Sequence, residues 1–445
     1  MSELRRCSAI GGLLAFVRPL ADAFAFGFGR GGVSIAAPQV TFVMAFLVVH
    51  VLAFLLVGPE GLRRPQAVYI ALLLSTVGLL AGTAIGWRQF ARPGLRHADP
   101  EPPTNTGSWL VALGIVLTAI GLVALATYLA RIGTLPIFLP DAEQARVDAA
   151  VRGGAPARVL GLVALPGTWL LVAGAVAARN KRLFALAILA LVIVVVSWLA
   201  TANRAPAFVA AQAWILTAIF VGGRARVGRR ALAAVVAAVA LAVFAAGVFG
   251  AIRMSDRLVR SPDAHSDGSI QATLSELGKL TTIAVRGYLV VPIQNLEYTM
   301  DAVPDRIPWR SGYTYIQPLL TALPGRQTTF DLDLKQALGQ DFRGGGTVPG
   351  LLGESYANFG PLGWLVVPAL VAWLLQWSFW FASRQRSAAA WTLHAYLLVQ
   401  SIGALLSGLS VASPFPVIAT VLLGIMTWLD LRTRRRAGMV MSSRA

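Results

Sequence analysis

The sequence is poor in cysteine, in lysine and in charged residues generally. Cys7 is the only cysteine among 445 residues, which excludes a disulfide within the chain. Charged residues make up 13% of the chain, against about a quarter in soluble domains, so an ordinary soluble fold is excluded. The net charge is nevertheless +18. Because this charge is spread over short loops and not gathered in a patch, we expect membrane lipid and not nucleic acid as the anionic partner.

Motifs for nucleotides, metals and common hydrolases are also missing. The chain contains no Walker loop, no glycine-rich dinucleotide fingerprint, no His-Glu-x-x-His and no Gly-x-Ser-x-Gly. Its four histidines are dispersed at His50, His97, His265 and His394, and none is spaced as a metal pair. We therefore expect no cofactor and no metal, and any reaction should be driven by an activated lipid-linked donor.

Long apolar runs are what the chain has instead. Hydrophobic residues make up 56% of it, and apolar runs of about 20 residues recur, each long enough to cross a bilayer. This predicts an all-α polytopic membrane protein with about ten transmembrane helices. The expected spans are 34–57, 66–87, 108–130, 157–178, 183–200, 205–221, 231–251, 361–382, 388–408 and 414–431. The pair 183–200 and 205–221 could equally be a hairpin or a re-entrant pair, since only a few residues separate its members.

The distribution of arginine among the loops predicts how the chain is oriented in the membrane. One set of connections carries 21 Lys and Arg residues and the opposite short loops carry 6, and basic loops stay in the cytoplasm. The basic set comprises the N-terminal arm, 88–107, 179–182, 222–230, 383–387 and the tail; the opposite set comprises 58–65, 131–156, 201–204 and 409–413. Both termini are therefore expected to be cytoplasmic. The expected organisation is an amphipathic arm at 1–33, helices one to seven at 34–251, a large outer loop at 252–360, helices eight to ten at 361–431 and a basic tail at 432–445.

The outer loop 252–360 is too long for a simple connection, and loops of this length are usually functional. Residues 280–300 are expected to form an interfacial or partly re-entrant helix interrupted at Pro292. Residues 313–324 are expected to lie on the surface, and 325–350 to form a flexible loop with three consecutive glycines. Acidic pairs leave metal binding as a minor alternative at Asp141, Glu143, Asp148, Asp331 and Asp333.

Arginines on the outer side are candidate phosphate ligands. Arg204 lies in the tight turn between two spans, Arg253, Arg257 and Arg260 follow the seventh span, and Arg286 lies among apolar residues. A guanidinium group binds phosphate through two hydrogen bonds and keeps its charge. The alternative is that these arginines only reach lipid headgroups beside the spans, an interpretation we favour for Arg253, Arg257 and Arg260.

The end of the outer loop carries a second constellation, Gly353-Glu-Ser-Tyr-Ala-Asn358, directly before a hydrophobic helix expected to begin near Pro361. On a helix, Glu354 and Asn358 would share one face and Tyr356 would point elsewhere. Polar groups at this depth are costly unless they are paired or face water. Glu354 could accept a proton from a sugar hydroxyl, or it could cap a helix start.

The segment Gly353-Glu-Ser-Tyr-Ala-Asn-Phe-Gly-Pro-Leu-Gly363 resembles the Wzy-type O-antigen polymerases, which join oligosaccharide repeat units. In that family a similar segment ends the large periplasmic loop, and an arginine follows a middle span, as in Ala202-Asn-Arg204. The specific match covers about 20 positions, and the remainder is agreement in topology, which other membrane proteins share.

The resemblance implies a metal-independent glycosyltransferase acting on undecaprenyl diphosphate-linked glycans. Arg204 and Arg286 would hold the donor diphosphate and stabilise it as a leaving group. Glu354 would be the base for the acceptor hydroxyl, and Tyr356 and Asn358 would bind sugar.

The remaining expectations concern further substrate contacts, partners and location. Arg253, Arg257 and Tyr288 would complete the substrate-binding set. The implied location is the bacterial cytoplasmic (inner) membrane. The implied partners are membrane lipids, with a chain-length regulator and a flippase as possible protein partners. The alternatives are an O-antigen ligase or another lipid-linked glycosyltransferase, and a transporter or flippase of lipid-linked sugars.

Overall fold

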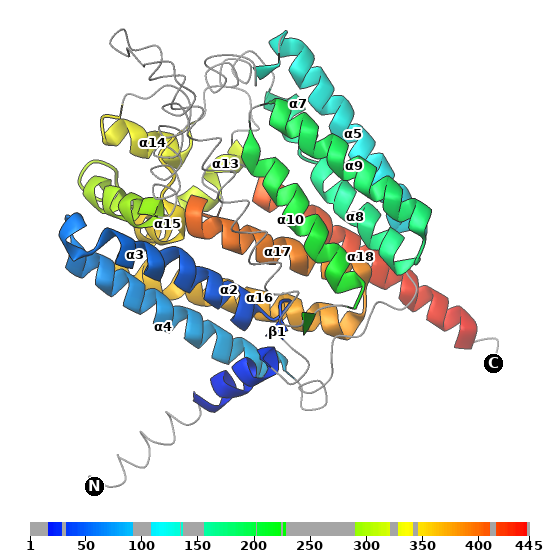
Figure 1. Ribbon diagram of the computed structural model, residues 1–445, viewed down its shortest axis with the longest axis horizontal. Helices are drawn as coiled ribbons and strands as arrows, with labels where there is room; N and C mark the ends of the chain where they lie inside the picture. Colours follow the sequence, from blue (N-terminus) through cyan, green and yellow to red (C-terminus); the bar gives the residue numbers. More distant parts are fainter. Residues whose placement is uncertain are drawn as a thin grey trace, which may run out of the picture.

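The computed structural model of the protein is a bundle of long apolar helices with shorter helices folded against one end (Figure 1). The residues that the structure describes are 17–28, 33–91, 108–133, 135–136, 155–201, 203–223, 226–227, 290–320, 328–340, 346–409 and 415–442.

Eight helices in the described residues are long and apolar enough to cross a membrane. They are Pro38–Val57, Pro65–Phe90, Trp109–Ile132, Pro156–Ala177, Lys181–Ala200, Pro361–Gln385, Ala388–Ser407 and Phe415–Thr433. The helix Ala205–Val221 is apolar but shorter. The prediction of a polytopic all-α membrane protein is therefore confirmed. The tenth expected span, 231–251, lies outside the described residues, so the count of ten and the cytoplasmic placement of the termini stay predictions.

The helix labels of Figure 1 follow the chain. The helices of the bundle are α2 (Pro38–Phe46), α3 (Leu52–Val57), α4 (Pro65–Phe90), α5 (Ser108–Ile132), α7 (Ala155–Gly161), α8 (Ala164–Ala177), α9 (Lys181–Ala200), α10 (Arg204–Val221), α16 (Pro361–Gln385), α17 (Ala388–Ser407) and α18 (Phe415–Ser442). A π-helical segment, Leu47–Val51, joins α2 to α3, so that the three form one span. The last helix continues through most of the expected tail, from Thr433 to Ser442.

Close backbone contact holds the helix pair α4 and α16 together. Gly78, Gly82 and Gly86 recur every four residues on α4 and face α16. A Cβ atom added at Gly82 would overlap the backbone of Ala369, and one at Gly78 would overlap Leu365. Small residues at this spacing let membrane helices approach without a side chain between them. Because the contacts advance along both helices together, α4 and α16 run parallel.

The second tight pair, α5 and α8, uses the same device in the antiparallel sense. Gly114 on α5 faces Gly167 and Leu171 on α8, and Gly174 faces Val111. Helix α17 lies between the two halves of the bundle, with most of its side chains buried against α16, α10 and α18.

Buried polar side chains add specific ties within the bundle. His394 of α17 forms hydrogen bonds through Nδ1 to Ser378 Oγ and through Nε2 to the Ala36 carbonyl, both at 2.8 Å. Gln376 donates to Gln39 Oε1 at 2.8 Å. His394, one of the four dispersed histidines, is fully buried.

Among the described residues, contacts between loops occur at two opposite ends of the bundle, as the charge pattern predicted. At one end, β1 (Val33–Ser34) pairs with β2 (Arg226–Val227), and Arg384 donates to the Phe90 carbonyl. Both contacts join loops of the basic set. The connections 58–65 and 409–413 contribute the contacts at the other end, where α15 lies (Figure 1). The alternation of sides is thus supported, and which side is cytoplasmic stays a prediction.

The N-terminal arm contributes a short helix, residues 17–27. Its Phe26 packs on Trp87, Phe379 and Trp380 with ring centroids 5.5–5.9 Å apart. Gln39 donates to the Ala23 carbonyl at 2.8 Å. A helix therefore forms within the expected arm and packs on α4 and α16, and the amphipathic character of the arm stays a prediction.

The shorter helices form what we call the loop assembly, residues 290–320, 328–340 and 346–360. It contains a helix at 290–302, a 3-10 turn at Tyr313–Tyr315, α13 (Gln317–Leu320), α14 (Phe330–Ala337) and α15 (Gly350–Phe359). Its small core comprises Ala302, Val303, Ile307, Phe330, Leu334 and Ala357. This core packs the assembly onto itself at the end of α16 and α17.

The expectation for residues 280–300 is only partly placed. Residues 290–302 form a helix that includes Pro292, and residues 280–289 lie outside the described residues, so the interruption at Pro292 stays a prediction. Another expectation for this region was wrong. Residues 325–350 are not simply loop, because α14 forms within them. Phe330 and Leu334, four residues apart, bury one face of α14 and so stabilise a helix that its charged residues obscure in the sequence.

Candidate functional site

The candidate site is built around α15, the short helix that carries the Glu354–Asn358 constellation. It ends at Gly360, whose φ of +62° is a conformation that glycine adopts without strain, and α16 begins at the next residue, Pro361. The predicted junction between loop and hydrophobic helix is therefore confirmed.

Glycines of the motif allow close approaches on three sides of this junction. A Cβ atom at Gly353 would lie 2.8 Å from Thr299 Oγ1 on helix 290–302. At Gly363 it would overlap the Ser355 carbonyl, and at Gly360 it would lie 3.4 Å from the indole of Trp309. The spacing of the motif is thus explained by packing.

Glu354 is fully buried and both of its carboxylate oxygens are hydrogen-bonded. Thr314 donates to Oε1 at 3.0 Å, and the backbone N–H of Leu409, just beyond α17, donates to Oε2. Glu354 does not cap a helix start, because it lies in the middle of α15. Its carboxylate instead ties the 3-10 turn to the end of a spanning helix.

Asn358 lies on the same face of α15, one turn later, as predicted from the spacing. Its Nδ2 donates to Thr314 Oγ1 at 2.6 Å and to the Glu354 carbonyl at 2.9 Å, and its Oδ1 accepts from the Gly312 N–H at 2.8 Å. Only 3% of the Asn358 surface is exposed, and its amide hydrogen bonds hold the turn at 311–315 in place.

Tyr356 points away from that face, again as predicted. Its ring is stacked on Trp364 and lies edge-on to Trp309, with both centroid distances 5.1 Å. The side chain is half-buried. Burial raises the pKa of the Tyr356 hydroxyl, the Arg64 guanidinium opposes this, and Asp305 adds to it. The phenol is therefore protonated near neutral pH and can donate a hydrogen bond.

Several members of this site were missed from the sequence. Tyr315 is directed toward the Glu354 face, where burial first and the Glu354 charge second raise the pKa of its hydroxyl well above the usual range. Thr314 links Glu354 to Asn358. The polar and aromatic run Trp309-Arg-Ser-Gly-Tyr-Thr-Tyr315 was the available signal, but its contacts with α15 join residues 40 or more positions apart in the sequence.

A second polar group surrounds α14. Arg310 forms an ion pair with Asp333 at 2.7 Å, and its guanidinium lies over the Phe330 ring. Asp331 is buried, and burial raises the pKa of its carboxyl to about 6. In the described part of the chain no three His, Cys, Asp or Glu side chains gather as a metal site. Asp333 is engaged by arginine.

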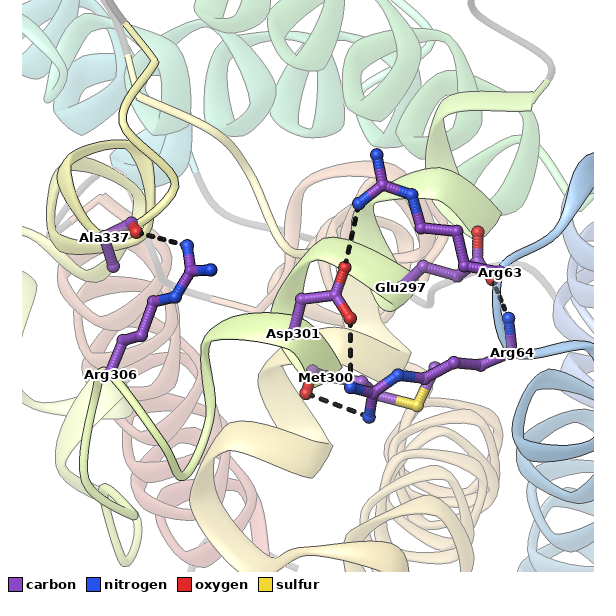
Figure 2. Close-up of polar contacts among 7 residues, drawn as sticks. All are labelled: Arg63, Arg64, Glu297, Met300, Asp301, Arg306 and Ala337. Atoms are coloured by element: carbon purple, nitrogen blue, oxygen red, sulfur yellow. Dashed lines mark hydrogen bonds and ion pairs between the residues drawn. The ribbon is translucent and has the colours of Figure 1, made fainter.

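A third group joins the connection 58–64 to helix 290–302 (Figure 2). Figure 2 shows the guanidinium groups of Arg63 and Arg64 converging on the Asp301 carboxylate, each at 3.2 Å. The Arg64 backbone N–H donates to Glu297 at 2.8 Å, and its side chain reaches the Met300 carbonyl. These contacts fix Arg64 beside the Tyr356 face of α15.

The predicted phosphate ligands are only partly placed. Arg204 is the first residue of α10, in the turn after α9, as expected, but the structure does not describe its side chain. Arg253, Arg257, Arg260, Arg286 and Tyr288 lie outside the described residues. Comparison of the chain with protein-family models, curated proteins and solved structures gives no match.

Proposed function

We propose that the chain polymerises lipid-linked oligosaccharide repeat units by transferring the growing glycan from its polyprenyl diphosphate to the next repeat unit. The observation that carries the proposal is α15. This helix unites a buried polar face and a partly exposed aromatic face at the point where the loop assembly meets two spanning helices. A reaction between a membrane-anchored donor and a polar acceptor requires a site at this boundary.

The roles of the individual residues follow from their surroundings. The described arrangement favours Glu354 and Asn358 as positioning residues, since their polar atoms are already hydrogen-bonded. A general base must reach the proton that it removes, so the predicted base role of Glu354 requires Thr314 and Leu409 to release it. Tyr356 is the member of the motif that is open to substrate. Arg204 and Arg286 remain the proposed diphosphate ligands.

The direct test uses purified protein in nanodiscs and lipid-linked repeat units extracted from host cells that lack the chain. No nucleotide sugar and no divalent metal are added, and products are separated by size. A ladder spaced by one repeat unit supports the proposal. Absence of a ladder, with movement of the intact lipid-linked sugar across sealed vesicles, would favour a transporter instead.

Arg204 allows a sharper version of this test. Arg204→Ala should abolish the ladder, and Arg204→Lys should lose most of it, because lysine cannot reproduce a two-point hydrogen bond to phosphate. Arg182→Ala, at the opposite end of α9, is the matched control and should leave the ladder unchanged. Equal activity of Arg204→Lys and the unaltered chain would reduce Arg204 to a headgroup contact.

A further inference from the structure

Trp309, which the sequence analysis did not single out, lies at the exposed edge of the motif. It is 41% exposed and sits over Gly360, where the φ of +62° would strain any other residue and an added Cβ atom would lie 3.4 Å from the ring. Its ring is edge-on to Tyr356, which in turn is stacked on the buried Trp364. The indole N–H of Trp364 is bonded to the Leu352 carbonyl at 3.2 Å. The inner ring of the stack is therefore anchored.

The outer part of this stack has unused hydrogen-bonding groups. Among the described residues, neither the Trp309 indole N–H nor the Tyr356 hydroxyl has a hydrogen-bond partner. Arg64 is close enough to influence the Tyr356 hydroxyl, and its side chain is 47% exposed. Asp301 and the Met300 carbonyl hold the Arg64 guanidinium in place.

We propose that Trp309, Tyr356 and Arg64 form a carbohydrate-binding platform that takes one sugar ring of the repeat unit. This inference rests on the proposed function and names the part of the site that binds glycan. The apolar C–H face of a pyranose packs on an aromatic ring, while its hydroxyl groups need donors and acceptors at the edge of that ring. The platform offers one partly exposed indole with its N–H, the phenol of Tyr356 edge-on to it and a guanidinium near that phenol.

Exposed tryptophans at a membrane boundary also act as interfacial anchors. An anchor requires an amphipathic ring alone, whereas here the ring lies edge-on to Tyr356, whose hydroxyl is free, and the fixed Arg64 lies near that hydroxyl. The local charge also favours a neutral ligand over a bare phosphate, because Glu297, Asp301 and Asp305 offset Arg63 and Arg64.

The test measures binding separately from reaction. The probe is the oligosaccharide released by mild acid from the lipid-linked pool of host cells that lack the chain. Saturation-transfer NMR on the nanodisc protein should detect contact with this sugar. Trp309→Ala and Tyr356→Ala should weaken binding about three- to ten-fold, the scale of a single aromatic contact. Trp309→Phe keeps an aromatic ring over Gly360, so its affinity for the sugar should lie between that of the alanine variants and that of the unaltered protein.

Trp428→Ala is the matched control, since Trp428 of α18 is 55% exposed, lies beside Arg432 and belongs to the opposite end of the bundle. It should bind sugar normally. In the ladder assay, Trp309→Phe should raise KM more than it lowers kcat. Unchanged binding in both Trp309 variants would overturn the platform and leave an interfacial anchor.

The two proposals fail in different ways. If sugar binding depends on Trp309 but no ladder forms, the polymerase proposal would be contradicted and the platform proposal supported. If a ladder forms and Trp309→Phe leaves KM unchanged, the polymerase proposal would be supported and the platform proposal contradicted. If Trp309→Ala does not fold, Trp309→Phe and Tyr356→Phe decide the question, because both preserve the packing.

Discussion

The spanning bundle and the loop assembly are held together by different means. In the bundle, α4 and α16 meet along Gly78, Gly82 and Gly86 through glycines and backbone, and Arg384 joins them only near their ends, where it donates to the Phe90 carbonyl. In the assembly, individual polar groups determine the structure: Glu354 and Asn358 each bind partners from other segments. The difference follows from solvent, because close packing is the main attraction available in lipid, whereas buried polar groups must each be satisfied.

The motif at 353–363 belongs to both regions. Gly353 and Gly363 provide close backbone contacts of the bundle type, and Glu354 and Asn358 provide hydrogen bonds of the assembly type. Tyr356 alone is left with a free polar group. A motif can therefore be rich in structural residues and still expose one side chain for function.

The largest expected effect comes from removing the buried carboxylate. Glu354→Ala leaves the Thr314 hydroxyl and the Leu409 N–H without their acceptor, and should lower the free energy of unfolding by about 2–5 kcal/mol. Glu354→Gln keeps one acceptor and should cost roughly half as much. Thermal unfolding in one detergent measures both, and Glu60→Ala, at an exposed position, is the control.

This measurement also separates the two roles considered for Glu354. If Glu354 is a positioning residue, activity should fall together with thermal stability from the unaltered chain to Glu354→Gln and then to Glu354→Ala. Full stability of Glu354→Ala with complete loss of polymer would contradict that role and restore Glu354 as the general base.

Removing the charge of another buried carboxylate, Asp331, should have the opposite effect and stabilise the chain. Burial raises the pKa of its carboxyl from 3.8 to about 6, so the folded chain binds a proton that the unfolded chain releases at that pH. Stability should thus decrease as pH rises from about 4 to 6, by up to about 3 kcal/mol. Asp331→Asn should unfold at a higher temperature than the unaltered chain at pH 8.

The advantage of Asp331→Asn should disappear near pH 4, where both side chains are neutral. Asp333→Asn is the matched control, because it loses the ion pair with Arg310 and should be destabilised at pH 8. An advantage of Asp331→Asn that does not change with pH would show that burial of the charge is not its cause.

These residues show where prediction from sequence succeeded and where it stopped. The start of α16 was predictable, because Gly360-Pro361 precedes a long apolar run. The shared face of Glu354 and Asn358 followed from helical spacing. Their partners Thr314 and Leu409 could not be predicted, since they are 40 and 55 residues from Glu354 and meet it only through tertiary structure. Helix α14 was missed because three charged residues mask its two buried apolar positions.

A smaller effect is expected from breaking the close packing of the bundle. Gly82→Ala places a methyl group against the Ala369 carbonyl, and such overpacking should cost about 1–3 kcal/mol. Gly424→Ala in α18 is the control, because a Cβ atom there meets nothing within 4 Å. That control should be neutral or slightly stabilising, as for glycine in any helix interior. Equal unfolding temperatures for the two variants would contradict the backbone contact between α4 and α16.

The smallest effect should come from the ion pairs of Figure 2. Arg63 is 72% exposed and pairs with Asp301 at 3.2 Å, so solvent screens the interaction. A double-mutant cycle with Arg63→Ala and Asp301→Ala should give a coupling energy below about 1 kcal/mol, and less in high salt. The same cycle with Arg64→Ala should couple more strongly, because Arg64 is less exposed and also bonds to the Met300 carbonyl. If the two cycles gave equal coupling, Arg64 would not be held more firmly than Arg63. Arg64 would then not provide a fixed guanidinium beside Tyr356. The contrast between a loop assembly held by specific polar contacts and a bundle held by close packing would also be weakened.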